Sequence, residues 1–226
     1  MLTKEQKYYL KKDGHVFIPS LLPDVNSIDF ANLIGSLFYP AKLNNNTLFN
    51  FVDILSPKDK NINKENTYSG IFGMNEFPYH TDFANLSLPP RYLLLRCFIG
   101  TLSVKTNVLS LDKILVDFGY NKLKRCILKP RDKLLTKYSL PLFLIFNNQY
   151  IRWDSVFLEP ANKHAENFYD WMQQQKWKDI ESSFSLLNKG DTLIIDNWKT
   201  LHSRSLVTEE SKSRTIERVY LSEIWE

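Results

Sequence analysis

The chain has 226 residues, of which 43% are hydrophobic, 14% aromatic and 24% charged. This length predicts a single domain, or one domain with a long insertion, and the composition is that of an ordinary soluble globular protein. No run of about eighteen apolar residues occurs, so a membrane-spanning helix is not expected. The seven glycines form neither a G-x-G pattern nor a P-loop, which argues against nucleotide-binding sites of the Rossmann and Walker types.

Twenty-nine Lys and Arg against 25 Asp and Glu leave a net charge of +4. That charge is compatible with acidic small molecules or weak nucleic-acid contact and requires neither. The two cysteines, Cys97 and Cys126, stand in apolar surroundings and are expected to be buried free thiols. Free thiols, together with a first segment that lacks the apolar stretch of a secretory signal, predict a cytoplasmic protein.

The first predicted elements are a charged helix, a short strand from His15 and an amphipathic helix over residues 24–37. Two polar segments follow, 44–47 and 56–66, and their turn-forming residues predict loops.

Strands dominate the rest of the chain, with short helices expected over 111–118 and from Pro160, near the first position of the helix. This order of elements predicts a mainly-β fold of the α+β class, a sandwich or jelly roll with peripheral helices. The predicted strands cover residues 77–83, 92–99, 107–111, 142–153 (two strands about an Asn-Asn turn), 191–195 and 215–224.

Two of the four histidines begin a His-x-acid triplet, His80-Thr-Asp82 and His164-Ala-Glu166. Alternate residues of a strand point to the same face, so His80 and Asp82 can reach one metal ion. In a helix they lie about 200° apart, which excludes the second triplet as a convenient chelate. His202, after an apolar strand and a turn, could complete a site of two histidines and one carboxylate.

Arg214 and Arg218 lie twelve and sixteen residues beyond His202. If residues 215–224 form a strand, this even spacing puts both arginines on one face. A guanidinium binds a carboxylate through two parallel hydrogen bonds, as a dicarboxylic cosubstrate requires. The alternative is surface ion pairing with Glu209, Glu210 or Glu217.

Three segments together resemble a known family. They are Phe77-Pro-Tyr-His-Thr-Asp-Phe83 with the following Pro89-Pro90, Ile195-Asp-Asn-Trp-Lys-Thr-Leu-His-Ser-Arg204, and Ser213-Arg-Thr-Ile-Glu-Arg218. Their order and spacing are similar to the signatures of the taurine dioxygenase and clavaminate synthase-like group of iron(II)- and 2-oxoglutarate-dependent oxygenases. The resemblance spans about residues 68–224.

The resemblance implies a single oxygenase domain over 1–226 with a double-stranded β-helix (jelly roll, cupin-like) core over about 69–226. A helix and strand region of about 1–40 would precede that core, and loops over about 41–68 are candidate lids. His80, Asp82 and His202 would be the catalytic metal ligands for Fe(II). Arg214 would bind the distal carboxylate of 2-oxoglutarate, and O2 would be the other cosubstrate.

A threonine also joins the cosubstrate site in this family, and here Thr106 and Asn107 are both candidates. The resemblance implies that Arg218 faces an anionic group of the substrate. For Arg152, a local ion pair with Asp154 is the alternative. The substrate-binding candidates are Arg218, Arg152 and Asn75.

The implied reaction hydroxylates a small carboxylate-bearing or amino-acid-like biosynthetic substrate and releases succinate and CO2. Halogenating relatives replace the carboxylate ligand by a small residue, so Asp82 favours hydroxylation over chlorination. The alternatives are a non-catalytic jelly-roll protein that binds a metal or ligand, and an oxygenase that acts on nucleic acid or on a protein. The basic stretch over 122–137 is most simply a solvated surface, so neither a nucleic-acid nor a membrane partner is expected.

Overall fold

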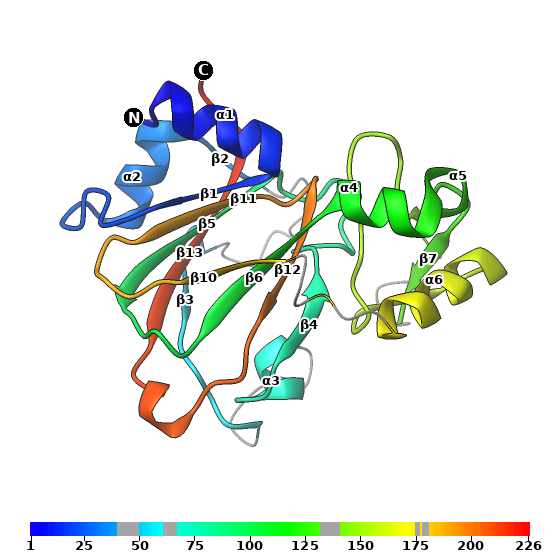
Figure 1. Cartoon of the computed structure of the whole chain (residues 1–226). Helices are drawn as coiled ribbons and strands as arrows, with labels where there is room; N and C mark the ends of the chain where they lie inside the picture. The colour runs from blue at the N-terminus through cyan, green and yellow to red at the C-terminus, as the bar shows by residue number, and fades with distance from the viewer. Residues whose placement is uncertain (40–49, 61–66, 132–140, 175–176, 178–180) are drawn as a thin grey trace.

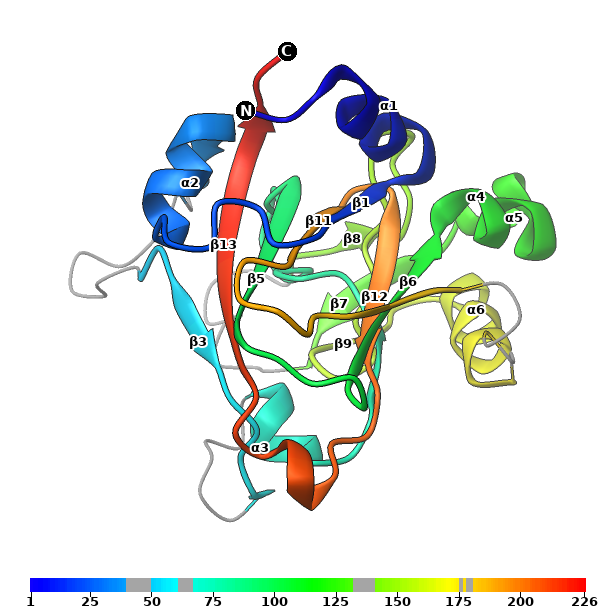
Figure 2. The same ribbon diagram turned by 60° about the vertical axis from the view of Figure 1, so that its left-hand side comes forward.

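The structure, a computed structural model, describes residues 1–39, 50–60, 67–131, 141–174, 177 and 181–226. Two antiparallel sheets face each other, and helices lie outside them (Figures 1 and 2). The fold is therefore mainly β with peripheral helices, as predicted. The larger sheet has the strand order β1-β11-β5-β13-β2, with β3 also paired to β13. Its strands are β1 (His15–Ile18), β2 (Gly35–Leu37), β3 (Asp53–Leu55), β5 (Tyr92–Ile99), β11 (Thr192–Asp196) and β13 (Thr215–Ile224).

The smaller sheet has the order β10-β6-β12-β4, and a third sheet, β8-β7-β9, lies beside it. The smaller sheet contains β4 (Phe77–His80), β6 (Lys105–Ser110), β10 (Ser182–Ser185) and β12 (Thr200–Arg204). The third contains β7 (Ile127–Pro130), β8 (Phe143–Leu144) and β9 (Leu158–Pro160). The helices are α1 (Lys4–Asp13), α2 (Ser27–Ile34), α3 (Tyr68–Phe72), α4 (Leu111–Ile114), α5 (Tyr120–Leu123) and α6 (Lys163–Gln174), with a π-helical turn at Leu115–Gly119 and a 3-10 turn at Glu209–Ser211.

The strands at the centre of the larger sheet are apolar throughout because both of their faces are covered. On β5, Leu93 and Leu95 pack in the core between the sheets, whereas Leu94 packs outward beneath α1 and α2. The outer face of the smaller sheet is covered by the lobe of α4, α5, α6 and β7 (Figure 1). Apolar packing thus covers the outer face of each sheet. Polar side chains can then lie in the space between the sheets.

The helical start and the strand from His15 are confirmed. Thr3 and Gln6 form a capping box at the start of α1, and Gly14 ends it with a φ of 75°, a conformation that glycine adopts without strain. The helix predicted over 24–37 is shorter: it ends at Ile34, and residues 35–37 form β2 against β13. Pairing with a distant strand overrides the helical periodicity there.

Two further predictions need correction. Pro160 does not open α6 but ends β9, and the helix begins at Lys163. Asp82 lies in a turn just beyond β4 rather than in the strand. His202, which follows the predicted turn, lies in the strand β12, paired with β4 and β6, and this strand was not predicted. Most of the predicted loops, 44–47 and 61–66, lies outside the described residues.

Cys97 and Cys126 are both buried and both free, as predicted. Burial raises the pKa of Cys97 to about 11 and that of Cys126 to about 12. Within the described ranges, no helix has the length and apolar character needed to cross a membrane.

Candidate metal and cosubstrate site

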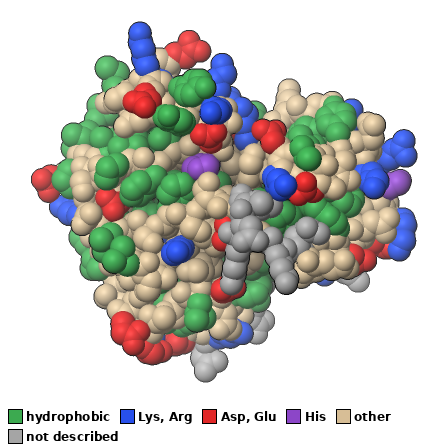
Figure 3. All heavy atoms as spheres, in the orientation of Figure 1, with side chains coloured by type: hydrophobic (Ala, Val, Ile, Leu, Met, Phe, Trp, Pro, Cys, Tyr) green, Lys and Arg blue, Asp and Glu red, His purple; other side chains and the backbone are tan. Residues whose placement is uncertain are grey.

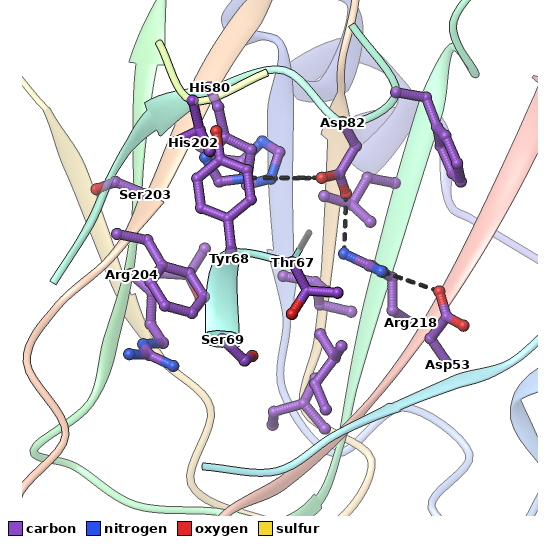
Figure 4. A pocket seen from close by; sticks show the side chains of 18 of the residues that line it. Asp53, Thr67, Tyr68, Ser69, His80, Asp82, His202, Ser203, Arg204 and Arg218 are labelled. Atoms are coloured by element: carbon purple, nitrogen blue, oxygen red, sulfur yellow. Dashed lines mark hydrogen bonds and ion pairs between the residues drawn. The ribbon is translucent and has the colours of Figure 1, made fainter. Parts of the chain in front are cut away.

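Three buried side chains converge at one point between the sheets: His80 from the end of β4, Asp82 from the next turn and His202 from the middle of β12. Their candidate ligand atoms all lie within 4.8 Å of one another. Oδ1 of Asp82 is 3.5 Å from Nε2 of His80 and 3.7 Å from Nε2 of His202. The close-up in Figure 4 shows the two imidazoles beside each other and turned toward Asp82. It is the only such cluster of three or more ligand-type side chains in the described part of the chain.

Strand pairing explains why residues so far apart in sequence meet. His202 is opposite His80 in the register of β12 against β4. The turn at Asp82 is fixed by Asn197, whose side chain accepts a hydrogen bond from the Asp82 amide (2.9 Å) and donates one to its carbonyl (3.1 Å). Asn197 is completely buried and belongs to the Asp-Asn pair of the second signature. Its role is therefore to shape the backbone that carries a metal ligand.

The donor set fits a divalent transition metal. Nδ1 of His80 donates to the carbonyl of Pro78 at 2.8 Å, which leaves Nε2 free to bind a metal ion. In His202, Nδ1 is buried and has no partner among the described residues, and Nε2 points to Asp82. Two imidazole nitrogens and one carboxylate oxygen are the ligands of a facial triad that leaves coordination positions open.

The charges around Asp82 favour its ionised form. Burial alone raises the pKa of its carboxyl, but the positive charges of Arg218 and His202 and hydrogen bonds from both histidines lower it well below the usual range. Burial and the charge of His80 lower the pKa of His202. Burial also lowers the pKa of His80, but its hydrogen bond to Asp82 and that carboxylate's charge outweigh burial and raise it. The ionised carboxylate of Asp82 beside two imidazoles suits the binding of a cation.

A cavity of about 1270 Å³ opens onto the three side chains. Arg214, Ile216, Arg218 and Tyr220 line it from one face of β13 and the residue before it, so the even spacing of the two arginines does put them on a common face. Such a volume accommodates more than one small molecule.

Arg214 presents a buried cation to this cavity. It is 6% exposed, and its Nε has no hydrogen-bond partner among the described residues. Burial lowers its pKa to about 10. The alternative of a surface ion pair with a nearby glutamate is not observed for Arg214 within the described residues: Glu209 pairs with Lys212, and Glu217 accepts a hydrogen bond from Ser27.

Arg218 is already paired. It donates to Oδ2 of Asp53 at 2.9 Å and to Oδ2 of Asp82 at 3.3 Å, as the dashed lines of Figure 4 show. The hydroxyl of Tyr220 donates to the same Asp82 oxygen at 2.7 Å. Oδ1 of Asp82 is consequently the oxygen that faces the histidines.

Of the two threonine-site candidates, the structure brings Thr106 to the cavity. Thr106 is buried in β6 and lines the cavity. It is the register partner of Arg204 on the neighbouring strand β12, which lines the cavity as well. The neighbouring Asn107 does not line it; its amide bonds to Ser203 and Ser183. Alternation along β6 accounts for this difference.

Arg152 and Asn75 do not line the cavity. Arg152 is buried, and its guanidinium donates to three backbone carbonyls in the segment after Asp82 and to the hydroxyl of Tyr150; it does not pair with Asp154. The three carbonyls are those of Ala84, Leu86 and Ser87. Asn75 is exposed, and its backbone carbonyl accepts a hydrogen bond from Arg204.

Several cavity residues were not predicted. The ring of Tyr68 stacks on that of His80 with a centroid distance of 4.1 Å. Arg204 lies 3.6 Å over the ring of Phe77 and donates to the Gly73 carbonyl. Two-residue periodicity with Arg218 could have indicated Tyr220. No local pattern marks Tyr68, Asp53 or Asp154, because they reach the cavity from three separate parts of the chain: α3, β3 and the segment before β9.

The basic stretch is partly neutralised where it is described. Lys129 and Arg131 both pair with Glu159, at 3.2 and 3.5 Å. On the face shown in Figure 3, basic side chains lie among acidic and hydrophobic ones. These contacts favour the solvated-surface interpretation over a nucleic-acid site.

The fold has clear counterparts among solved structures, although no family model and no curated protein sequence matches the chain. An asparagine oxygenase in complex with Fe(II), 3-hydroxyasparagine and succinate has a TM-score of 0.65 and 16% identity, over 96% of this chain and 78% of that one. PvcB from Pseudomonas aeruginosa has a TM-score of 0.65 and 14% identity, over 95% of this chain and 78% of that one.

A third neighbour is the non-heme iron oxygenase OrfP in complex with Fe, succinate and (3S)-hydroxy-L-Arg. Its TM-score is 0.55 and its identity 20%, over 76% of this chain and 57% of that one. At such identities the similarity establishes a common fold: this chain has the fold of iron- and 2-oxoglutarate-dependent oxygenases.

Proposed function

We propose that the protein is an Fe(II)- and 2-oxoglutarate-dependent dioxygenase that hydroxylates a small, amino-acid-like substrate. The observation that carries this proposal is the buried group of His80, Asp82 and His202, which opens on the same cavity as the unpaired cation of Arg214. The fold of the neighbours supports it. The two facing sheets would then be the double-stranded β-helix of one oxygenase domain.

His80, Asp82 and His202 would hold the iron. When bound, Fe(II) supplies the activation of O2, with which 2-oxoglutarate is oxidised to succinate and CO2 while one oxygen atom enters a C–H bond of the substrate. The protein's part is to orient the ligands. Pro78 fixes the ring of His80, and Tyr220 and Arg218 fix the carboxylate of Asp82.

Arg214 and Thr106 would bind 2-oxoglutarate. A buried guanidinium without an acidic partner favours an anion strongly, because little water competes for it. Thr106 lines the same cavity and offers a hydroxyl. The chain therefore provides both a charged and a neutral donor for the dicarboxylic cosubstrate.

The substrate side of the cavity would include Arg218, for which an anionic substrate group would compete with Asp53. Residues 52–58, which include Asp53 and belong to the predicted lid, also line the cavity. The neighbours' complexes with hydroxylated asparagine and arginine support an amino-acid-like substrate. Aromatic shielding by Tyr68 would keep the reacting centre dry.

Anaerobic addition of Fe(II) and 2-oxoglutarate, followed by air, tests the proposal. We expect a visible charge-transfer absorption before aeration and succinate afterwards, with more succinate when the correct amino acid is present. His202→Ala should abolish both signals, whereas His164→Ala, a matched change in an exposed histidine of α6, should abolish neither.

A non-catalytic binding protein on the same fold is the second possibility. The buried Arg214 in the same cavity argues against it, since metal binding alone does not require a cation beside the metal ligands. Metal binding without any succinate, from a folded protein and across the whole amino-acid panel, would favour this alternative.

A further inference from the structure

Three carboxylates line the cavity in the described part of the chain: Asp53, Asp82 and Asp154. Asp53 pairs with Arg218, and Asp82 faces the two histidines. Asp154 is only 5% exposed, yet it forms no ion pair with any residue that the structure describes. A buried carboxylate without a cationic partner is costly, so this side chain calls for a function.

The backbone holds Asp154 through one of its oxygens. Oδ1 accepts hydrogen bonds from the amides of Val156 (2.8 Å) and Phe157 (2.9 Å), which close the turn after it. Oδ2 accepts no backbone amide, and Arg131, which contacts the Ser155 carbonyl, pairs with Glu159 instead. The Tyr68 hydroxyl also faces this carboxylate as a hydrogen-bond donor, but it is neutral and leaves the charge of the second oxygen available to a cationic ligand.

Asp154 is also held next to the proposed metal ligands. The preceding residue, Trp153, exchanges hydrogen bonds with Thr81, the residue between His80 and Asp82: Thr81 N donates to the Trp153 carbonyl at 2.8 Å, and Trp153 N donates to Thr81 Oγ1 at 3.1 Å. A group bound at Asp154 is thus positioned beside the reacting centre.

We propose that Asp154 binds a positively charged nitrogen group of the substrate, an ammonium or a guanidinium. The inference rests on the proposed function and adds the charge of the substrate to it. An N–H donor on Oδ2 would form a charge-assisted hydrogen bond away from water, which is among the stronger polar contacts. Arg214 and Arg204 in the same cavity favour anions, so Asp154 distinguishes the cationic end of a zwitterion from the carboxylate of 2-oxoglutarate.

Binding without turnover tests this proposal. The protein is loaded with Zn(II), which is redox-inactive, and with 2-oxoglutarate, and is then titrated calorimetrically with the common L-amino acids and their Nα-acetyl derivatives. Asp154→Asn keeps the oxygen that caps the turn and removes the charge. Asp170→Asn, an exposed position on α6, is the matched control.

We expect Asp154→Asn to weaken binding of the best amino acid by about tenfold or more, and Asp170→Asn to leave it unchanged. Loss of wild-type binding on Nα-acetylation assigns the α-ammonium group; retention by acetylated arginine or lysine assigns the side-chain cation, and both support the proposal. It is overturned if Asp154→Asn binds as tightly as the wild type. It is also overturned if the wild type prefers no cationic compound over its neutral counterpart, a comparison that needs no variant. Failure to bind Zn(II) or 2-oxoglutarate at all would instead contradict the proposed function.

Discussion

The hydroxyl of Tyr220 donates a hydrogen bond of 2.7 Å to Oδ2 of Asp82. Both residues are buried, and they approach each other from different segments, the last strand and the turn after β4. Because Oδ2 is occupied in this way, Oδ1 is the oxygen presented to His80 and His202. The phenol of Tyr220, together with Arg218, thus orients the carboxylate ligand.

Tyr220→Phe tests this orientation. We expect the affinity for Co(II) or Fe(II), measured by anaerobic titration, to fall by about 10- to 100-fold, the usual effect of removing a partner that orients a metal ligand. Tyr92→Phe is the matched control, since Tyr92 is also buried but packs in the outer cluster beneath α1 and α2. Equal metal affinities for the two variants would contradict an orienting role for Tyr220.

Replacing Thr106 and replacing Asn107 should affect 2-oxoglutarate binding differently. Since only Thr106 lines the cavity, Thr106→Val should raise the KM for 2-oxoglutarate by about 3- to 10-fold, the effect of one lost hydrogen bond. The volume of the side chain is retained, so the fold should be unaffected. A larger rise in KM for Asn107→Ala than for Thr106→Val would assign the contact to Asn107 instead.

The features that sequence could predict are those set by local periodicity. The strands over 92–99 and 215–224 were predicted with their observed bounds because both are long and well patterned. Even spacing likewise predicted that Arg214 and Arg218 share a face. The His80-Thr-Asp82 triplet was identified correctly although Asp82 lies in a turn and not in a strand. Either conformation can bring two side chains that are two residues apart close together.

The features that sequence missed depend on contacts between distant segments. Asp53 meets Arg218 across 165 residues, and only the pairing of β3 with β13 makes that contact. Arg152 was predicted to bind the substrate, but its guanidinium donates hydrogen bonds to backbone carbonyls in the segment after Asp82. No local pattern distinguishes an arginine that binds carbonyls of its own chain from one that binds a substrate.

Replacement of Arg152 should therefore lower stability rather than substrate affinity alone. Arg152→Met would leave buried carbonyl acceptors without donors, at about 1–3 kcal/mol for each, so we expect the free energy of unfolding to fall by roughly 3 kcal/mol or more. Urea denaturation at neutral pH measures it. Arg125→Met, at an exposed arginine, should change stability by less than about 0.5 kcal/mol. A stable Arg152→Met protein with a raised substrate KM would restore Arg152 as a substrate-binding residue.

Arg214 predicts a characteristic pH dependence for 2-oxoglutarate binding. Burial lowers the pKa of its guanidinium to about 10, so the cation is present below that pH and is lost as the pH rises through it. The carboxylates of 2-oxoglutarate stay ionised over the whole range. The Kd of the Zn(II)-loaded protein should accordingly be constant from about pH 7 to 9 and increase above about pH 10. Equilibrium dialysis with labelled 2-oxoglutarate measures it, with circular dichroism to verify the fold at each pH. Arg214→Gln should bind weakly throughout and lose this dependence, because no charge remains to titrate; a wild-type Kd that stays flat to pH 11 would show that the anion is held by another group.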